Sequence, residues 1–518
     1  TTGSSTVIGA TGINDPIAGL AFNDASGTMY GLTGGASGGA SNLVRINLTT
    51  GAATVIGSVG FNGGSLEFGA DGALYAGSTG GTGNLYRINP ATGASTLVGA
   101  TGFTNITGLT LVAAVSPTPT PTPTPTPPAI RFSAGAYSVS ESSTDVTITV
   151  TRSGNTSGES VVQYATSDSA GLNGCGVVKT GVASPRCDYQ STAGTLRFAP
   201  GEIARTIVIP IVNDSYADGN ESFTITLSDA SGGVLDLPRT AVVTIVDNDA
   251  ANGPNPADQS SSFVRQHYLD FLNREPDAAG LQFWTNEIES CGANTACRDV
   301  RRINVSAAFF VSIEFQQTGY LVERLYKTSF GDAVGNSTSP SAHTLPVPVI
   351  RLNEFLADSQ TIGQGVVVNS PGWEQQLENN KVAFIAAFVQ RPRFISAYGS
   401  LTNATFVALL NANAGNPLST AERNQLVADL DSTAKTRAQA LRTIAEHPNL
   451  AASESNRAFV LMQYFGYLRR NPNDAQDTDY TGYEFWLTKL NQFHGDYIAA
   501  EMVKAFISSS EYRQRFGP

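Results

Sequence analysis

The strongest constraint on the fold is a run of alternating proline and threonine at residues 116–128, SPTPTPTPTPTPP. Proline fixes φ and has no amide to donate, so such a run is extended as polyproline II and builds no core. At about 3.1 Å per residue it spans on the order of 40 Å. The chain is therefore expected to fold as separate parts on either side of a spacer, with about three to five domains for its length.

The segment before the spacer, residues 1–115, contains an internal repeat with a spacing of 42 to 48 residues. TVIG occurs at 6–9 and 54–57 and returns as TLVG at 96–99, and LVRIN at 43–47 returns as LYRIN at 85–89. Short apolar alternations between glycine turns at this period are typical of β-propeller blades. The segment resembles about two blades of bacterial β-propellers. A closed propeller needs roughly four to eight, so we expect a partial propeller whose other blades lie upstream of Thr1.

Residues 129–250 alternate apolar and polar side chains in short runs separated by turn residues, for example at 146–150, 206–209, 223–227 and 242–245. About seven such strands in a segment of this length predict an all-β, immunoglobulin-like sandwich of two sheets.

Acidic side chains of this sandwich gather at strand ends and turns. The segment holds 13 acidic and 7 basic residues, so it has half of the chain's net charge of −12. Carboxylates that converge at one pole repel each other by roughly 4 kcal/mol per close pair at an effective dielectric near 20. A hard cation relieves this repulsion, and Ca²⁺ accepts six to eight oxygen ligands in irregular geometry. The alternative is that these acids are ordinary turn formers at solvated strand ends.

The same residues form a family pattern. VSE at 139–141, DY at 188–189, GTLRF at 194–198, DGNESF at 218–223 and IVDND at 245–249 together resemble a Calx-beta domain. The resemblance implies a Ca²⁺ site whose ligands are Glu141, Asp188, Asp214, Asp218, Asp247, Asn248 and Asp249. Asn213 and Asn248 stand where strongly binding versions have Asp. We therefore expect the weak calcium affinity that is typical of extracellular modules, with a Kd of ~10⁻⁴–10⁻³ M.

Four cysteines form two close pairs, Cys175 with Cys187 and Cys291 with Cys297. Neither pair has the spacing of a zinc site, so two local disulfides and an oxidising compartment are predicted. Four unrelated thiols are the alternative. A 175–187 disulfide would close the loop before Asp188. It would either only constrain this loop or also hold Asp188 in position.

After a polar linker at 251–261, the pattern changes to helical spacing and predicts an all-α domain over 262–518. A repeat lies within it: Tyr268-x2-Phe271-x2-Arg274-x-Pro276 leads to Phe283-Trp284, and Tyr464-x2-Tyr467-x2-Arg470-x-Pro472 leads to Phe485-Trp486. A degenerate third unit is expected at 381–413. These motifs resemble domain of unknown function 4214, which is similar to phycobilisome linker repeats and implies an interaction module. We expect both tryptophans to anchor the core rather than to form sugar platforms.

These features predict a non-enzymatic protein, secreted or exposed at the cell surface, that binds calcium and adheres to an extracellular protein or polysaccharide. The negative charge excludes nucleic acid as a natural partner, and no apolar run reaches membrane-spanning length. The four histidines all lie beyond residue 260, and no HExxH or P-loop motif is present. Two alternatives stay open: a carbohydrate- or matrix-binding accessory module of a larger extracellular protein, and an enzyme whose catalytic part precedes Thr1.

Overall fold

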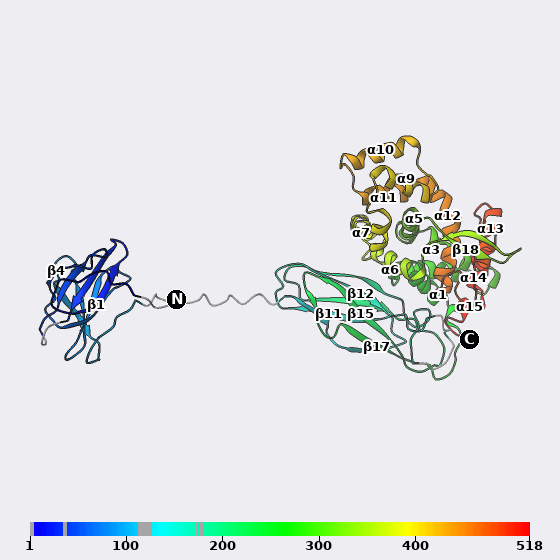
Figure 1. The fold of residues 1–518 in the computed structure, drawn as a ribbon. Helices are drawn as coiled ribbons and strands as arrows, with labels where there is room; N and C mark the ends of the chain where they lie inside the picture. Colours follow the sequence, from blue (N-terminus) through cyan, green and yellow to red (C-terminus); the bar gives the residue numbers. More distant parts are fainter. Residues whose placement is uncertain (1–4, 35–38, 112–126, 172–174, 176–180) are drawn as a thin grey trace. The chain divides into compact units, whose positions relative to one another are not determined.

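The computed structural model describes residues 5–34, 39–111, 127–171, 175 and 181–518. Most of the predicted Pro-Thr spacer, residues 116–126, lies outside the described residues. Contacts within the chain define two compact units, Thr1–Thr124 and Pro125–Pro518, which Figure 1 colours from blue to cyan and from cyan to red.

The N-terminal unit consists of two four-stranded antiparallel sheets in which the strands follow chain order. Strands β1 and β5 approach so closely that a Cβ on Gly19 would lie 2.8 Å from the Leu66 amide nitrogen. Consecutive antiparallel strands are also the order within a propeller blade, and the propeller stays a prediction. The strands are β1 (Ile17–Asn23), β2 (Thr28–Thr33), β3 (Asn42–Ile46), β4 (Ala53–Ser58), β5 (Gly63–Phe68), β6 (Leu74–Ser78), β7 (Asn84–Ile88) and β8 (Ser95–Ala100).

The second unit begins with a two-sheet sandwich, and the four strands cited from the sequence are confirmed within β11, β14, β15 and β17. One sheet has the order β10-β17-β15-β12-β13 and the other β14-β11-β9-β16. Alternate residues of each strand fill the core between them, as a period of two requires. The strands are β9 (Ala129–Phe132), β10 (Ala136–Ser140), β11 (Asp145–Ser153), β12 (Ser160–Thr166), β13 (Ala193–Phe198), β14 (Ala204–Pro210), β15 (Glu221–Ser231), β16 (Val234–Leu235) and β17 (Thr240–Val246).

The rest of the unit is largely helical. The helices are η2 (Pro256–Asp258), α1 (Ser260–His267), η3 (Tyr268–Leu272), α2 (Ala278–Glu289), α3 (Thr295–Val311), α4 (Ile313–Gln317), α5 (Gly319–Phe330), α6 (Leu352–Gly363), α7 (Trp373–Phe388), α8 (Pro392–Tyr398), α9 (Asn403–Asn413), α10 (Thr420–Asp431), α11 (Arg437–Ala445), α12 (Pro448–Met462), η4 (Gln463–Leu468), α13 (Thr481–Gln492), α14 (Met502–Ile507) and α15 (Ser510–Arg513).

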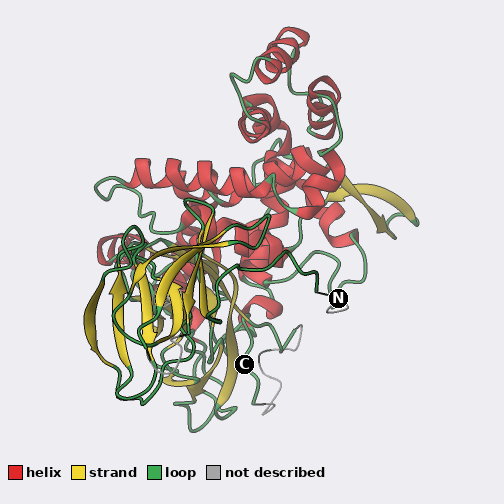
Figure 2. Cartoon of the chain, turned by 60° about the vertical axis from the view of Figure 1, so that its left-hand side comes forward, coloured by secondary structure: helices red, strands yellow, loops and turns green. Residues whose placement is uncertain are grey.

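The prediction of an all-α domain is wrong at one place. Strands β18 (Asp332–Ser337) and β19 (His343–Pro348) form an antiparallel hairpin that extends from the helices (Figure 2). Its strands are short and contain glycine and proline, so only Val334, Leu345 and Val347 give an alternating apolar signal. Gly335 lets Tyr480, the residue before α13, pack against the hairpin, since a Cβ at Gly335 would lie 2.7 Å from the Tyr480 ring.

The two repeats found in the sequence have the same local structure. In each, an α-helix (α1 or α12) runs into a π-helix (η3 or η4) and ends at a left-handed residue, Asn273 with φ 55° or Arg469 with φ 53°. The next helix, α2 or α13, presents the Phe-Trp pair, and both tryptophans are half-buried against the helical core. We call these units repeat 1 (260–318) and repeat 2 (448–517). Residues 381–413 include α8 and α9, and their membership of the repeat stays a prediction.

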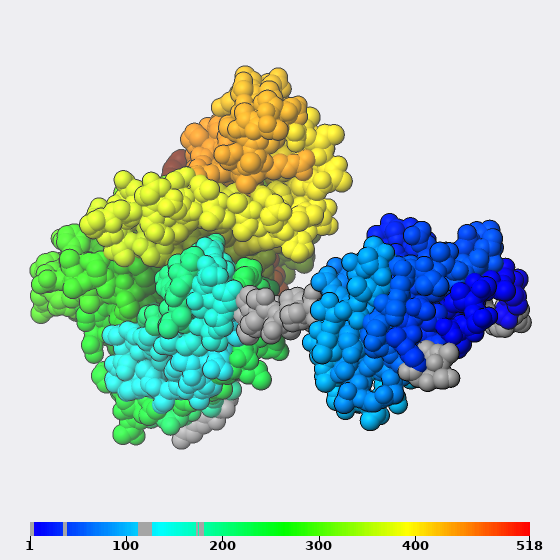
Figure 3. All heavy atoms as spheres, turned by 90° about the vertical axis from the view of Figure 1, so that its left-hand side faces the viewer, coloured from blue at the N-terminus to red at the C-terminus, as the bar shows by residue number. Residues whose placement is uncertain are grey.

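The sandwich packs directly against the helical region. Helix α6 lies on β13, where Gln360 accepts a hydrogen bond from the Ala193 amide at 2.7 Å. Arg265 of α1 donates to the carbonyls of Thr144 and Ile211 at 2.9 and 2.8 Å. Figure 3 shows the segment near residues 350–400 in yellow against the cyan and green sandwich. The two domains therefore share one interface within this unit.

Candidate metal centre

The two strands that end at the candidate metal centre are neighbours and run in parallel. Strands β10 and β17 are paired with Ser140 opposite Val246, so the residues that follow them, Glu141 and Asp247, leave the sheet at the same edge. Strand β15 is antiparallel to β17 and begins at this edge, with Glu221 opposite Ile245. One pole of the sandwich thus receives acidic residues from three adjacent strands.

Loops bring further carboxylates to the same pole. The connection between β14 and β15 contains Asp214 and Asp218, and the Asp214 amide donates to Glu141 Oε1 at 2.9 Å. An isolated bridge between Tyr189 and Ile211 places Asp188 beside this connection. The Val212 amide donates to the Asp188 carbonyl at 2.9 Å.

Both predicted disulfides are present in the structure. Cys187, next to Asp188, is bonded to Cys175, and Cys291 is bonded to Cys297. The first disulfide fixes the chain immediately before a candidate ligand. Residues 176–180 of the loop that it closes lie outside the described residues.

Three carboxylates are close enough to share one ion. Glu141, Asp247 and Asp249 each offer an oxygen atom, and these oxygens all lie within 4.8 Å of one another. Backbone amides orient the cluster: Gly219 donates to Asp247 Oδ2 and Asp249 to Asp247 Oδ1, both at 2.7 Å. Oxygens on opposite sides of a Ca²⁺ ion at 2.3–2.6 Å are separated by about 4.6–5.2 Å. The spacing of this triad therefore fits calcium.

Burial and mutual repulsion raise the pKa of the clustered acids. Burial, followed by the charges of Asp249 and Asp247, raises the pKa of Glu141 to about 7. Burial together with Glu141, Asp218 and Asp249 raises the pKa of Asp214 to about 9. The pKa values of Asp188, Asp218, Glu221 and Asp249 are also raised, in each case first by burial and then by neighbouring carboxylates. These groups resist ionisation unless a cation accompanies them.

The donor set fits a hard cation in two further respects. No ion pair with Lys, Arg or His involves any of these acids within the part of the chain that the structure describes. Asp249 Oδ2 is buried and lacks a hydrogen-bond partner among the described atoms. All the available ligand atoms are oxygens, which Ca²⁺ prefers over nitrogen or sulfur.

The structure gathers six of the seven predicted ligand side chains at this pole: Glu141, Asp188, Asp214, Asp218, Asp247 and Asp249. Asn248 differs, because its side chain is exposed and its backbone amide is the group that donates to Glu141. Glu221 was not among the predicted ligands, yet its carboxyl is hydrogen-bonded to that of Asp188. Its place in the DGNESF motif, directly before a strand, was the available signal.

Comparison with known families places this pole within a recognised domain. The family model of the Calx-beta domain matches residues 125–249, and the model of domain of unknown function DUF4214 matches residues 250–318. The second match covers repeat 1 and stops before repeat 2.

Three individual relatives each match less than a quarter of this chain. A 75-residue stretch is 37% identical to the zebrafish (Danio rerio) adhesion G-protein coupled receptor V1, which is 14% of this chain and 1% of that protein. The apo-form Calx CBD1 domain is 29% identical over 24% of this chain and 98% of its own, with a TM-score of 0.20. The CBD12 structure from CALX1.2 is 30% identical over 23% of this chain and 45% of its own, with a TM-score of 0.21.

Proposed function

We propose that the protein is a non-enzymatic, calcium-binding structural or adhesion protein of the cell surface or extracellular space, in which calcium stiffens the sandwich and the other modules provide binding surfaces. The observation that carries the proposal is the convergence of Glu141, Asp247 and Asp249 on one point. Calx-beta domains bind calcium, and the acidic cluster lies within the segment that this family model matches.

Bound calcium would act on the fold by replacing repulsion with shared coordination. Glu141, Asp247 and Asp249 would be the first candidates for ligands, with Asp214 and Asp218 next to them. These residues follow β10, follow β17 and lie in the β14–β15 connection. One ion would therefore hold together three segments that are far apart in the sequence.

Two further observations support an extracellular location. Both disulfides favour an oxidising compartment. The matched zebrafish protein is named an adhesion receptor, which supports a role at surfaces. Within the described residues, the helices lack the combination of length and hydrophobicity that a membrane crossing requires.

Calorimetric titration of Ca²⁺ into the full chain tests the proposal. We expect saturable heat with a Kd near ~10⁻⁴–10⁻³ M, and we expect Asp247→Ala to abolish it, since Asp247 belongs to the triad and accepts two backbone amides at the pole. Asp236→Ala is the matched control, because Asp236 is an exposed acid of the same domain whose recorded ion pair is with Arg131 at 3.5 Å. Equal heats for wild type and Asp247→Ala would contradict the proposed site.

A further inference from the structure

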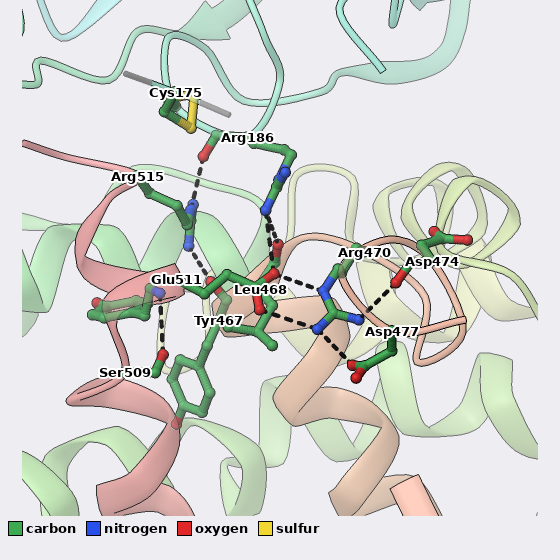
Figure 4. A network of polar contacts seen from close by, with 12 residues as sticks. Cys175, Arg186, Tyr467, Leu468, Arg470, Asp474, Asp477, Ser509, Glu511 and Arg515 are labelled. Atoms are coloured by element: carbon green, nitrogen blue, oxygen red, sulfur yellow. Dashed lines mark hydrogen bonds and ion pairs between the residues drawn. A yellow bond between two sulfur atoms is a disulfide. The ribbon is translucent and has the colours of Figure 1, made fainter. Parts of the chain in front are cut away.

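Repeat 2 binds a segment of the sandwich through a buried arginine (Figure 4). Arg186 Nη2 donates to the Leu468 carbonyl at 3.2 Å and to Glu511 Oε1 at 3.4 Å. Glu511 is already held by Arg470, whose Nε and Nη2 donate to its two oxygens at 2.6 and 3.0 Å. The structure thus contains one example of how a repeat of this kind receives another protein segment.

Charge is balanced at this docking point. Glu511 and Asp477 supply two negative charges, and Arg470 supplies one positive charge, with its Nη2 at 2.8 Å from Asp477 Oδ2. Arg186 supplies the second positive charge from outside the repeat. Its side chain is only 10% exposed and that of Glu511 14%, so solvent and salt screen this contact less than a surface ion pair.

Repeat 1 has three charged groups of the same kinds, one arginine and two acids, and the charge that Arg186 supplies to repeat 2 has no match here among the described residues. Arg274 Nε and Nη2 donate to the two oxygens of Glu314 at 2.7 and 2.8 Å, and Asp277 lies 4.0 Å from Arg274. Among the described residues, no second cation forms an ion pair with Glu314 or Asp277. Repeat 1 therefore has a local charge of −1 where repeat 2, with Arg186 docked, is neutral.

The groups of repeat 1 that correspond to the docking point line an open groove. Its volume is about 670 Å³, and Leu272 and Glu314, the counterparts of Leu468 and Glu511, both line it. Apolar side chains surround the ion pair. Phe283 is 57% exposed and Ile313 59% exposed, and Ile313 stands where repeat 2 has Ser510. The groove thus offers an anionic point inside an apolar rim, which matches an arginine with apolar neighbours.

We propose that the groove of repeat 1 is a docking site for an arginine-bearing protein segment, bound as repeat 2 binds the Arg186 segment of the sandwich. The arginine supplies the missing positive charge to Glu314 and Asp277, and apolar residues beside it contact Ile313, which stands where repeat 2 has Ser510. This docking site specifies the kind of partner that the proposed interaction role of the helical module requires. It does not involve the metal centre. Its failure would leave the calcium site standing.

The three tryptophans of the chain allow each repeat to be observed separately. Trp284 lines the groove of repeat 1, Trp486 is its counterpart in repeat 2, and Trp373 serves as a reference. The full chain is labelled with 5-fluorotryptophan, and the ¹⁹F resonances are assigned with Trp284→Phe and Trp486→Phe. The probe is a capped peptide with the sequence of residues 181–190, in which serine replaces the cysteine.

We expect the peptide to shift the Trp284 resonance saturably and to leave Trp486 unchanged. A peptide with glutamine in place of arginine should bind at least ~10-fold more weakly, because a charge-assisted contact is lost. Asp277→Asn in the protein should weaken binding in the same direction.

Three results would overturn the proposal. One is an arginine peptide that leaves the Trp284 resonance unchanged. Another is an equal response of Trp284 to the arginine and glutamine peptides, which would leave only apolar contact. The last is a Trp284 shift caused by neutral oligosaccharides and not by the peptide, which would assign the groove to a sugar.

Discussion

Glu141 and Asp214 hold protons at pH values where ordinary carboxylic acids have lost them. Burial raises the pKa of Glu141 from 4.5 to about 7 and that of Asp214 from 3.8 to about 9. Between the ordinary and the raised pKa, the folded protein binds protons that the unfolded chain does not. A raised carboxyl pKa therefore gives stability that is present at low pH and is lost as the pH rises through the folded-state value.

This sign predicts a weaker dependence of the melting temperature on pH with metal than without it. In EDTA, the melting temperature should fall by about 5 °C or more between pH 5 and pH 9. In excess Ca²⁺ the fall should be smaller, because the ion replaces the protons, and calcium affinity should rise with pH. Differential scanning calorimetry at three pH values measures both trends. Asp214→Asn should reduce the slope in EDTA, and a slope that is the same in this variant would contradict the assignment.

Single residues also show where sequence reasoning stops. The acids that end strands or lie in family motifs, such as Asp247 and Asp214, could be selected from the sequence alone. The pairing of Glu221 with Asp188 could not, because it depends on the Tyr189–Ile211 bridge that closes a loop onto a strand end. The exposed side chain of Asn248 is likewise a result of local backbone direction, since its amide faces Glu141.

At the scale of elements, a glycine near the start of α2 is required by its neighbour. Gly280 lies in α2, where alanine would usually be more stable by roughly 1 kcal/mol. A Cβ at this position would lie 2.2 Å from the Tyr268 hydroxyl oxygen, and one at Gly482 in repeat 2 would lie 2.7 Å from that of Tyr464. In both repeats the glycine therefore gives room to a tyrosine from the preceding π-helix.

Gly280→Ala should consequently destabilise the protein, by about 1–3 kcal/mol, through overpacking. The double variant Gly280→Ala/Tyr268→Phe should recover much of this loss, since the hydroxyl that clashes is gone. Chemical denaturation of Gly280→Ala, Tyr268→Phe and the double variant measures the coupling between the two positions. Gly363→Ala at the end of α6 is the control, because the nearest atom to its Cβ is 3.8 Å away. Additive effects of the two substitutions would contradict the steric explanation.

Elements in which apolar residues recur with a regular period could be predicted from the sequence, and short irregular elements could not. The sandwich strands and the two repeats follow from alternation and helical spacing. The β18–β19 hairpin was missed because its apolar signal is weak and because Tyr480, which packs against it, lies some 130 residues beyond its end at Pro348. The left-handed Arg469 also depends on tertiary contacts, since its guanidinium group is buried near Asp270.

At the scale of the whole unit, the metal centre and the domain interface are built from the same segments. The Ser184 amide donates to Asp188 Oδ2 and fixes the turn that presents Arg186 to repeat 2. In the other segment, Asp214 Oδ1 accepts from the Tyr216 amide at 2.8 Å, and the Tyr216 hydroxyl donates to the Gln514 carbonyl at 3.1 Å. Calcium binding that orders Asp188 and Asp214 should therefore also order Arg186 and Tyr216, which contact repeat 2.

Arg515 joins this interface to the helical core. Its Nε donates to the Arg186 carbonyl at 2.8 Å, and its two terminal nitrogens donate to the carboxylate of Asp270 at 2.8 and 2.9 Å. The side chain is fully buried. We therefore expect this connection to transmit an ordering effect from the sandwich loop to the C-terminal turn.

Calcium should therefore slow hydrogen exchange in the C-terminal segment 505–518, although none of its residues is a proposed ligand. At ten times Kd the ion stabilises the folded state by about 1.4 kcal/mol, which is about a tenfold slowing for amides that exchange through opening of this interface. Mass spectrometry with and without Ca²⁺ measures the effect, and the hairpin segment 332–348 serves as the internal reference. Tyr216→Phe, which keeps every carboxylate, should retain the calcium heat and reduce the protection of 505–518. If calcium binds with full heat and leaves the exchange of this segment unchanged, the metal centre acts on the sandwich alone and the shared segments do not couple it to the repeats.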